Sequence, residues 1–313
     1  MTVRKSFLVP ALFGLYCFLV SILFFKFLTK GDQVAYTHFY ETVSGYNLFT
    51  GFIYYNGILG AIEPVYYIIV FVFSHFVPKV LLFSVINGMF GYYLALLLLW
   101  RRTLWIVLIP LALNFYLFVL LFVAERLKVS LCFLLFAFAV ASGRNQLFSS
   151  VAAALSHVQT VLLLVSIQLA KTAPGLKRIL KGKINYKIIA LFFLGFTILA
   201  GALVFRGYLM GKLSSYSSLG AARSMIKPTF FMLLTLIYAR NAKLEAILLH
   251  LPLIMASFFV GDIRIVIFSY FIFFYYASAY RRGINWGMLV TSGYFMVKGV
   301  VFLIAILKYG TGF

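Results

Sequence analysis

The sequence predicts an all-α integral membrane protein with about eleven transmembrane or partly re-entrant helices. Hydrophobic residues make up 64% of the 313 residues, whereas charged residues make up only 11%, against about 25% in soluble domains. The apolar runs are mostly about 18–22 residues long and lack the alternation of a barrel strand. Backbone groups inside a bilayer must bond to one another, so we expect each run to form a helix.

The expected helices follow the apolar runs along the chain and form a single membrane domain, 1–313. The first, 6–28, is interpreted as an uncleaved helix because it is too long for a signal peptide and lacks a small-x-small cleavage site. A polar, aromatic outer segment, 29–62, follows, and its stretch from Asp32 to Tyr46 predicts a short interfacial helix. The remaining runs are 63–77, 79–100, 103–124, 127–143, 146–170, 188–206, 227–240, 244–261, 263–280 and 285–308.

Lys and Arg in the short loops predict which side of the membrane each loop faces. The segment 171–187 carries six cations and no acid, so it is the strongest cytoplasmic marker. Two further cytoplasmic markers are the pairs Arg240 with Lys243 and Arg281 with Arg282. Counting from these markers places the loop 207–226 and the C-terminus outside.

Two topologies remain open for the N-terminal half. Eleven full crossings would place Arg101 and Arg102 outside, against the positive-inside rule. In the alternative, which we prefer, 63–77 dips into the membrane without crossing and 146–170 breaks near His157 into two half-helices. The dipeptide Glu63-Pro64 fits a helix start, because proline lacks the amide hydrogen that would be unpaired there. Half-helices at membrane depth occur around cavities, so this topology also implies a site.

Cations far outnumber acids: 27 Lys and Arg against 6 Asp and Glu give a formal net charge of +21. Several cations lie at the ends of apolar runs on the expected outer face, where they oppose the orientation rule and need another explanation. Arginine bonds two phosphate oxygens at once through its planar guanidinium. We therefore expect a diphosphate-binding set, with snorkelling or pairing with an acid as the simpler alternative. Its members are Arg126, Arg206, Arg223, Arg264 and Lys227.

A second group of residues is suited to proton transfer and sugar binding. His157 is the best candidate for a general base, because the pKa of free histidine lies near neutrality; a satisfied core histidine is the alternative. Glu63 and Asp32 are candidate catalytic acids or bases, although each also suits a helix start. The aromatic outer loops offer stacking platforms for sugars, or an interfacial belt. The candidate sugar-binding residues are Tyr36, Tyr40 and Tyr216.

Several chemistries are excluded by residues that the sequence lacks. No DxD-like pair of acids is present to hold a divalent metal, and Cys17 and Cys132 have neither disulfide nor metal-site spacing. No glycine-rich nucleotide loop occurs. We therefore expect no metal, no cofactor and no nucleic-acid partner. Any group transfer would need a pre-activated donor that resides in the membrane.

The order of these residues resembles the EpsG/Wzy-type polysaccharide polymerases of bacterial envelopes. The matching features are an early outer-loop acid with two tyrosines, a Glu-Pro helix start, an Arg at a helix start, a Ser-His pair about one helix later, and a late Arg followed by a Tyr. Family members often carry Arg-Gln where this chain has Arg126-Leu127. The residues that carry the likeness are Asp32, Tyr36, Tyr40, Glu63, Pro64, Arg126, Ser156, His157, Arg264 and Tyr270.

The resemblance implies a metal-independent, GT-C-like glycosyltransferase in the bacterial inner membrane. Such an enzyme transfers the growing chain onto a new undecaprenyl-diphosphate-linked oligosaccharide at the outer, periplasmic face and releases undecaprenyl diphosphate. Its partners would be these lipids, the surrounding membrane lipids, and a chain-length regulator and flippase of the same pathway. The alternatives are a flippase or transporter of the same lipid, another polyprenyl-phosphate-dependent glycosyltransferase or ligase, and a non-enzymatic assembly subunit.

Overall fold

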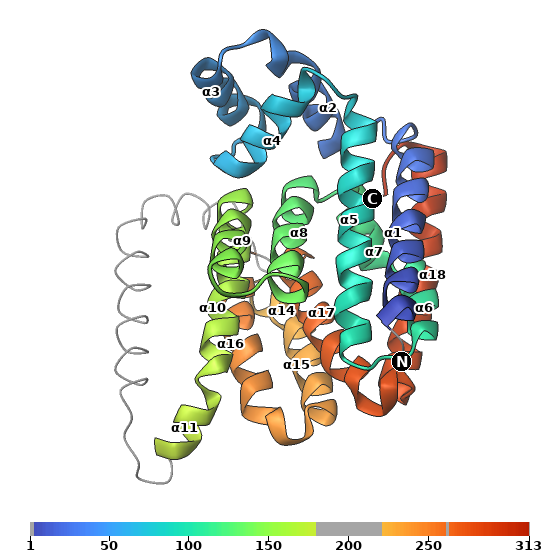
Figure 1. The fold of residues 1–313 in the computed structure, drawn as a ribbon, viewed down its shortest axis with the longest axis vertical. Helices are drawn as coiled ribbons and strands as arrows, with labels where there is room; N and C mark the ends of the chain where they lie inside the picture. The colour runs from blue at the N-terminus through green and yellow to red at the C-terminus, as the bar shows by residue number, and fades with distance from the viewer. Residues whose placement is uncertain (1–2, 180–220, 261–262, 313) are drawn as a thin grey trace. The chain divides into compact units, whose positions relative to one another are not determined.

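The computed structural model describes residues 3–179, 221–260 and 263–312, and these fold into helices without a β-strand (Figure 1). The chain packs as two compact units: Met1–Thr160 with Arg281–Phe313, and Val161–Tyr280. Both units contain a helix long and apolar enough to cross a membrane. The described part of the chain is therefore all-α with several membrane-capable helices, as the composition predicts, whereas the single domain expected over 1–313 stays a prediction.

The first unit begins with the long helix α1 and continues through a series of short helices to a second long helix, α5. A short 3-10 turn, η1 (Val43–Gly45), continues α2, so the stretch from Asp32 to Tyr46 is helical as expected, and its interfacial position stays a prediction. The helix α5 has the bounds of the run expected at 79–100. The bounds are α1 (Val3–Phe25), α2 (Asp32–Thr42), α3 (Leu48–Leu59), α4 (Pro64–Ser74) and α5 (Lys79–Trp100).

The rest of the first unit consists of short helices and a long C-terminal helix, α18. The helix α8 packs against α5 and α9, and α18 packs against α6 and α7. The bounds are η2 (Trp105–Val107), α6 (Leu108–Ala112), α7 (Phe115–Phe122), α8 (Glu125–Ala139), α9 (Gly143–Ser156), η4 (Tyr280–Gly283) and α18 (Trp286–Tyr309).

The helices α1 and α5 run side by side and approach each other closely at glycines (Figure 1). A Cβ added at Gly14 would lie 2.8 Å from the carbonyl oxygen of Gly88, and one at Gly91 would lie 2.6 Å from the Cys17 Sγ. Small residues allow such close backbone packing between membrane helices. Beside this contact, the Asn87 side-chain amide donates to the Ser21 Oγ at 2.6 Å, so a buried polar bond also joins the pair.

Two of the expected spans are interrupted. The run 103–124 breaks at Asn114, whose side chain accepts hydrogen bonds from the amides of the next helix and so starts α7 afresh, with a 65° bend. The run 146–170 breaks at His157, whose backbone is extended (φ −162°, ψ 123°) between α9 and α10 (Gln159–Lys171). The break near His157 is therefore confirmed, whereas the break at Asn114 was not expected.

The count of eleven spans is not supported by the structure. Among the described residues, four helices are long and apolar enough to cross a membrane, or six if each bent pair counts as one span. The two bent pairs are α3 with α4, at 113°, and the helices on either side of Asn114. The run expected at 188–206 lies outside the described residues. Apolar composition continues on both sides of Asn114, so one run of hydrophobic residues can hold two short helices instead of one straight span.

Two basic turns lie at the same end of the first unit. The amide of Leu104, just after Arg101 and Arg102, donates to the carbonyl oxygen of Arg282 at 3.0 Å. This contact brings the turn after α5 beside the turn before α18. The preferred topology places both turns on the cytoplasmic side, and their proximity agrees with it, whereas eleven full crossings would separate them by a membrane.

The second unit contains the shorter helices that follow the break at His157. Its centre is formed by α15, α16 and α17, which pack against one another. The ring of Phe231 lies against Tyr270 and Phe273, with centroid distances of 5.6 and 6.0 Å. The bounds are α11 (Ala173–Ile179), α14 (Ala221–Ser224), α15 (Ile226–Tyr238), η3 (Arg240–Ala242), α16 (Lys243–Val260) and α17 (Ile263–Ala279).

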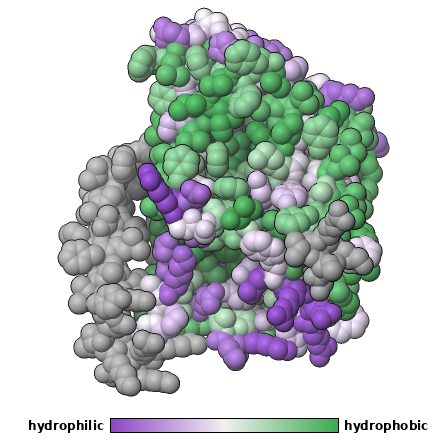
Figure 2. Space-filling model, in the orientation of Figure 1, coloured by the Kyte–Doolittle hydropathy of each residue, from purple (hydrophilic) through white to green (hydrophobic). Residues whose placement is uncertain are grey.

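Much of the visible surface is apolar, as Figure 2 shows in green. On α18, for example, Val290, Val297 and Val301 are 65%, 62% and 60% exposed. Their spacing of seven and four residues places them on one side of the helix. Such a stripe suits a helix that faces lipid rather than water.

Candidate functional site

The sharp bend between α3 and α4 positions the first residue of the site, Glu63. The two helices meet at 113°, and Glu63 is the last residue before α4, with an extended backbone (φ −81°, ψ 103°). Pro64 then begins the helix, as the Glu63-Pro64 pattern predicts. Because the chain turns here, the Glu63 side chain points into the first unit, where only 8% of it is exposed.

The Glu63 carboxylate is the centre of a buried hydrogen-bond network. Its Oε2 accepts from the Arg126 Nη1 at 2.9 Å and from the Tyr55 hydroxyl at 3.0 Å. Its Oε1 lies 3.2 Å from the same Arg126 nitrogen and 3.1 Å from the His157 Nδ1. A carboxyl group surrounded by so many donors is held in its ionised, accepting form.

Arg126 is anchored through two of its three guanidinium nitrogens. It lies in the first turn of α8, where its Nη1 pairs with Glu63 and its Nε donates to the Tyr36 hydroxyl at 3.1 Å. The side chain is 14% exposed. Its Nη2 carries two further N–H donors for which the described part of the chain shows no hydrogen bond. Arginine N–H groups commonly bind phosphate oxygens.

The contacts of His157 define its protonation pattern. An ionised carboxylate carries no hydrogen, so the Nδ1 of His157 donates to Glu63. The Nε2 lies 3.3 Å from the Gln159 Oε1, which only accepts hydrogen bonds, so this contact needs a hydrogen on Nε2 as well. A carboxylate that holds one ring nitrogen fixes the tautomer and orientation of a histidine. With a hydrogen on both nitrogens the ring is the imidazolium, and Nε2 can accept a proton only after it has released its own.

A second ion pair lies one residue before Arg126 on α8. The Lys79 Nζ is 3.0 Å from the Glu125 Oε1 and also donates to the Gln33 Oε1 at 3.0 Å and the Thr37 Oγ1 at 2.9 Å. Glu125 is fully buried, and its Oε2 accepts from the Tyr66 hydroxyl at 3.0 Å. The start of α8 is thus fixed to the helices α2, α4 and α5.

Tyr36 joins the two ion pairs. Its hydroxyl accepts from Arg126, while its ring lies 5.8 Å from the Lys79 Nζ. Lys128, one turn further along α8, is fully buried, donates to the carbonyl oxygen of Leu121 at 2.9 Å and lies 5.1 Å from the ring of Phe83. The formal charges here are three cations, Lys79, Arg126 and Lys128, against two carboxylates.

The network lies at the end of α5 opposite to the basic turns. Lys79 is the first residue of α5, and Arg101 directly follows its last residue. A 22-residue helix is about 33 Å long, at about 1.5 Å per residue, which matches the hydrocarbon thickness of a membrane. The charged network and the basic turns are therefore separated by about the thickness of a membrane.

The structure brings together only some of the residues that the sequence singled out. Glu63, Arg126, His157 and Tyr36 form one network, and Tyr40 lies nearby, where its hydroxyl donates to the carbonyl oxygen of Val77 at 2.6 Å. Burial raises the pKa of Tyr40 to about 12, so this hydroxyl keeps its proton.

The other expected residues are either exposed or outside the described part of the chain. Asp32 is exposed in the first turn of α2, where its charge suits the helix dipole. Arg223 and Lys227 are exposed residues of the second unit. Arg206, Tyr216 and the side chain of Arg264 lie outside the described residues. Of the expected diphosphate set, Arg126 is the member that the described residues of the first unit place in the network.

Several residues of the network were not singled out from the sequence. Tyr55 and Gln159 contribute hydrogen bonds to Glu63 and His157, and neither carries a charge that would mark it. Lys79 directly precedes an apolar run, and Lys128 follows Glu125 by three residues inside another run. Ionisable residues in apolar stretches are a usable signal for a buried site, and these two would have been found by applying it uniformly.

No protein-family model matches the chain, and neither curated proteins nor solved structures are similar to it.

Proposed function

We propose that this protein is a membrane glycosyltransferase that polymerises undecaprenyl-diphosphate-linked oligosaccharides at the outer face of a bacterial inner membrane. The growing chain is the donor, and a hydroxyl of a new lipid-linked unit attacks its anomeric carbon. The new C–O bond forms as the bond to the diphosphate oxygen breaks, and undecaprenyl diphosphate leaves. The proposed fold is of the metal-independent GT-C kind.

The observation that carries this proposal is the Glu63–Arg126–His157 network. Arg126 and His157 lie 63 and 94 residues after Glu63 in the sequence, yet both contact its carboxylate. They supply a proton acceptor and a cation for a departing anion, which are the two functions that the proposed reaction needs. Burial strengthens both, since preorganised charges act most effectively where water is excluded.

Each residue then has a role in the proposed reaction. Once Nε2 has released its hydrogen to water and left the Gln159 Oε1, His157 accepts the proton of the attacking hydroxyl at Nε2. Glu63 orients the imidazole and stabilises its cation once the proton has arrived. Because Glu63 accepts from several donors and is ionised, it is a weaker base than His157 and serves as the positioning carboxylate.

Arg126 acts on the leaving group. Its Nη1 and Nε bind Glu63 and Tyr36, so the side chain is fixed before substrate arrives and loses little freedom on binding. The two N–H groups of its Nη2 bind diphosphate oxygens as negative charge develops on them. The remaining cations of the proposed diphosphate set, Arg206, Arg223, Arg264 and Lys227, would complete neutralisation.

The position of the network supports an outer-face reaction. The basic turns at Arg101–Arg102 and Arg281–Arg282 mark one end of the first unit, and positive loops face the cytoplasm. The network lies at the opposite end of α5. Lipid-linked repeat units presented on the outer face would meet it there.

The proposal is tested in a strain that lacks the gene, by resolving its surface polysaccharide as a ladder on a gel. Complementation with the wild-type gene restores the ladder, whereas Arg126→Ala leaves single repeat units on the surface. Arg144→Ala, an exposed arginine of α9, is the matched control and should restore the ladder. Loss of all surface sugar with lipid-linked units retained inside would instead indicate a flippase, and an unchanged ladder would exclude both.

A further inference from the structure

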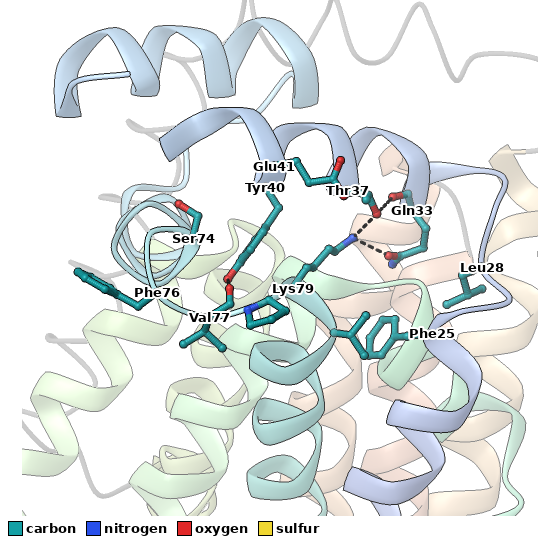
Figure 3. Close-up of a pocket in the computed structure, with 12 residues that line it drawn as sticks. Phe25, Leu28, Gln33, Thr37, Tyr40, Glu41, Ser74, Phe76, Val77 and Lys79 are labelled. Carbon is teal, nitrogen blue, oxygen red and sulfur yellow. Dashed lines mark hydrogen bonds between the residues drawn. The ribbon is translucent and has the colours of Figure 1, made fainter. Parts of the chain in front are cut away.

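A cleft of about 610 Å³ lies beside the charged network in the first unit (Figure 3). Its walls are the end of α1, one face of α2 and the chain from the end of α4 to the start of α5. The volume is within the roughly 300–1,000 Å³ of small-molecule sites. Tyr40, Glu41, Thr37, Ser74, Phe76 and Lys79 line the cleft and determine its chemistry.

The lining hydroxyl groups present acceptors rather than donors. The Tyr40 hydroxyl donates to the carbonyl oxygen of Val77 at 2.6 Å, the Thr37 Oγ1 to that of Gln33 at 2.8 Å, and the Ser74 Oγ to that of Phe71 at 2.9 Å. With these hydrogens committed, the oxygens retain lone pairs for a ligand. The first turn of α5 adds backbone N–H donors, as every helix start does. Ligand hydroxyls, which both donate and accept, match this lining.

The charge of the cleft does not favour an anion. The ammonium of Lys79 has three hydrogens and three acceptor contacts, with Gln33, Thr37 and Glu125. Glu41 lies on the same lining and is exposed. Lys79 and Glu41 are the two charged residues of the lining, so the formal charge of the cleft is zero. A phosphate, which only accepts hydrogen bonds, would meet acceptor oxygens and a carboxylate there.

We propose that this cleft binds an uncharged, hydroxyl-rich ligand, namely neutral sugar rings. Phe76, which is 81% exposed, offers an apolar surface for the C–H face of a ring. Glu125 and Arg126 are consecutive in α8, so the cleft adjoins the diphosphate-binding side chain through Lys79. The assignment of these rings to the substrate of the transfer reaction rests on the proposed function, whereas the affinity for neutral sugars does not.

The test is a binding measurement on the purified full chain in nanodiscs of phosphatidylethanolamine. Saturation-transfer NMR with maltose, a neutral disaccharide, is compared with the same measurement on glucuronic acid, an anionic sugar. Maltose should give saturable binding, and glucuronic acid should bind more weakly. Tighter binding of glucuronic acid than of maltose, or no saturable binding of maltose, would overturn the proposal.

Two matched threonine variants localise the site. Thr37→Val replaces the lining hydroxyl with a methyl group and should weaken maltose binding at least five-fold. Thr42→Val removes a hydroxyl that likewise donates to the carbonyl four residues earlier on α2 but lies outside the cleft, so its affinity should stay within two-fold of wild type. Equal affinities in the two variants would contradict the assignment. A thermal transition unchanged from wild type verifies that each variant is folded.

The same chemistry could be supplied by the glycerol of a lipid headgroup. Replacing the phosphatidylethanolamine of the nanodisc with phosphatidylglycerol distinguishes the two sources. Unchanged maltose affinity supports the sugar, and displacement of maltose by phosphatidylglycerol would overturn the sugar in favour of the headgroup. Because binding is measured without turnover, a negative result here leaves the proposed transferase activity untouched.

Discussion

The pairing of Glu63 with Arg126 makes a quantitative prediction about stability. The two side chains are 8% and 14% exposed and 2.9 Å apart. Glu63→Gln would place an amide where Arg126 and Tyr55 now find a carboxylate, and would leave the guanidinium without its counter-ion. Removing one partner of a buried pair costs about 3–5 kcal/mol. Because Arg126 is partly exposed, we expect Glu63→Gln to lower the free energy of unfolding by about 3 kcal/mol, at the low end of this range. We expect a similar loss for Arg126→Gln.

The two single variants and the double variant form a thermodynamic cycle. In the double variant neither charge remains, so its loss of stability should be smaller than the sum of the single losses by about 2 kcal/mol or more. Independent sites add within about 0.5 kcal/mol. The free energy of unfolding is measured by reversible titration with dodecyl sulfate in mixed micelles, followed by circular dichroism. Additive losses would refute the claim that these residues act as one buried pair.

Three further variants probe other parts of the account. His157→Gln retains a donor for Glu63 but cannot accept a proton, so the transfer rate should fall about 10²–10⁴-fold while substrate binding is kept; unchanged turnover would remove His157 as the base. Lys79→Met leaves the buried Glu125 unpaired and should cost about 3 kcal/mol, part of which Glu125→Gln should restore. Gly91→Ala places a methyl group against Cys17 and should cost about 1–3 kcal/mol in unfolding experiments, and recovery by Cys17→Ala would identify that contact as the cause.

Helix boundaries marked by local chemistry were predictable from the sequence. The helix at Lys79–Trp100 follows a proline and ends at two arginines, and the helix after Glu63-Pro64 begins where a missing amide hydrogen is tolerated. For these two helices the signal lies within a few residues of the feature. The break near His157 was expected from the positive-inside rule instead, because two half-helices there leave Arg101–Arg102 and Arg144 on the cytoplasmic side.

The number of spans was not predictable in the same way. Asn114 lies inside a continuous apolar run, and its cap separates α6 from α7 although composition is unchanged across it. Hydropathy averaged over a window is insensitive to a single capping residue. A helix-capping residue such as Asn in the middle of an apolar run can therefore mark a helix break, as a charged residue can.

The contacts of the site were predictable in part. Four residues selected from the sequence, Glu63, Arg126, His157 and Tyr36, converge in the structure. Their mutual pairing, and the contributions of Tyr55 and Gln159, depend on how α2, α3, α8 and α9 pack. Such long-range contacts leave no local pattern in a single sequence.

The most direct test of the central claim is reconstitution of the purified protein in nanodiscs with its undecaprenyl-diphosphate-linked repeat unit. The account predicts that the glycan lengthens and that one undecaprenyl diphosphate is released for each unit added. Arg126→Lys, which keeps the charge but loses the planar fork, should abolish most of this turnover, while Arg144→Lys should keep it. Wild-type protein that releases no undecaprenyl diphosphate, or an Arg126→Lys variant with full turnover, would contradict the account.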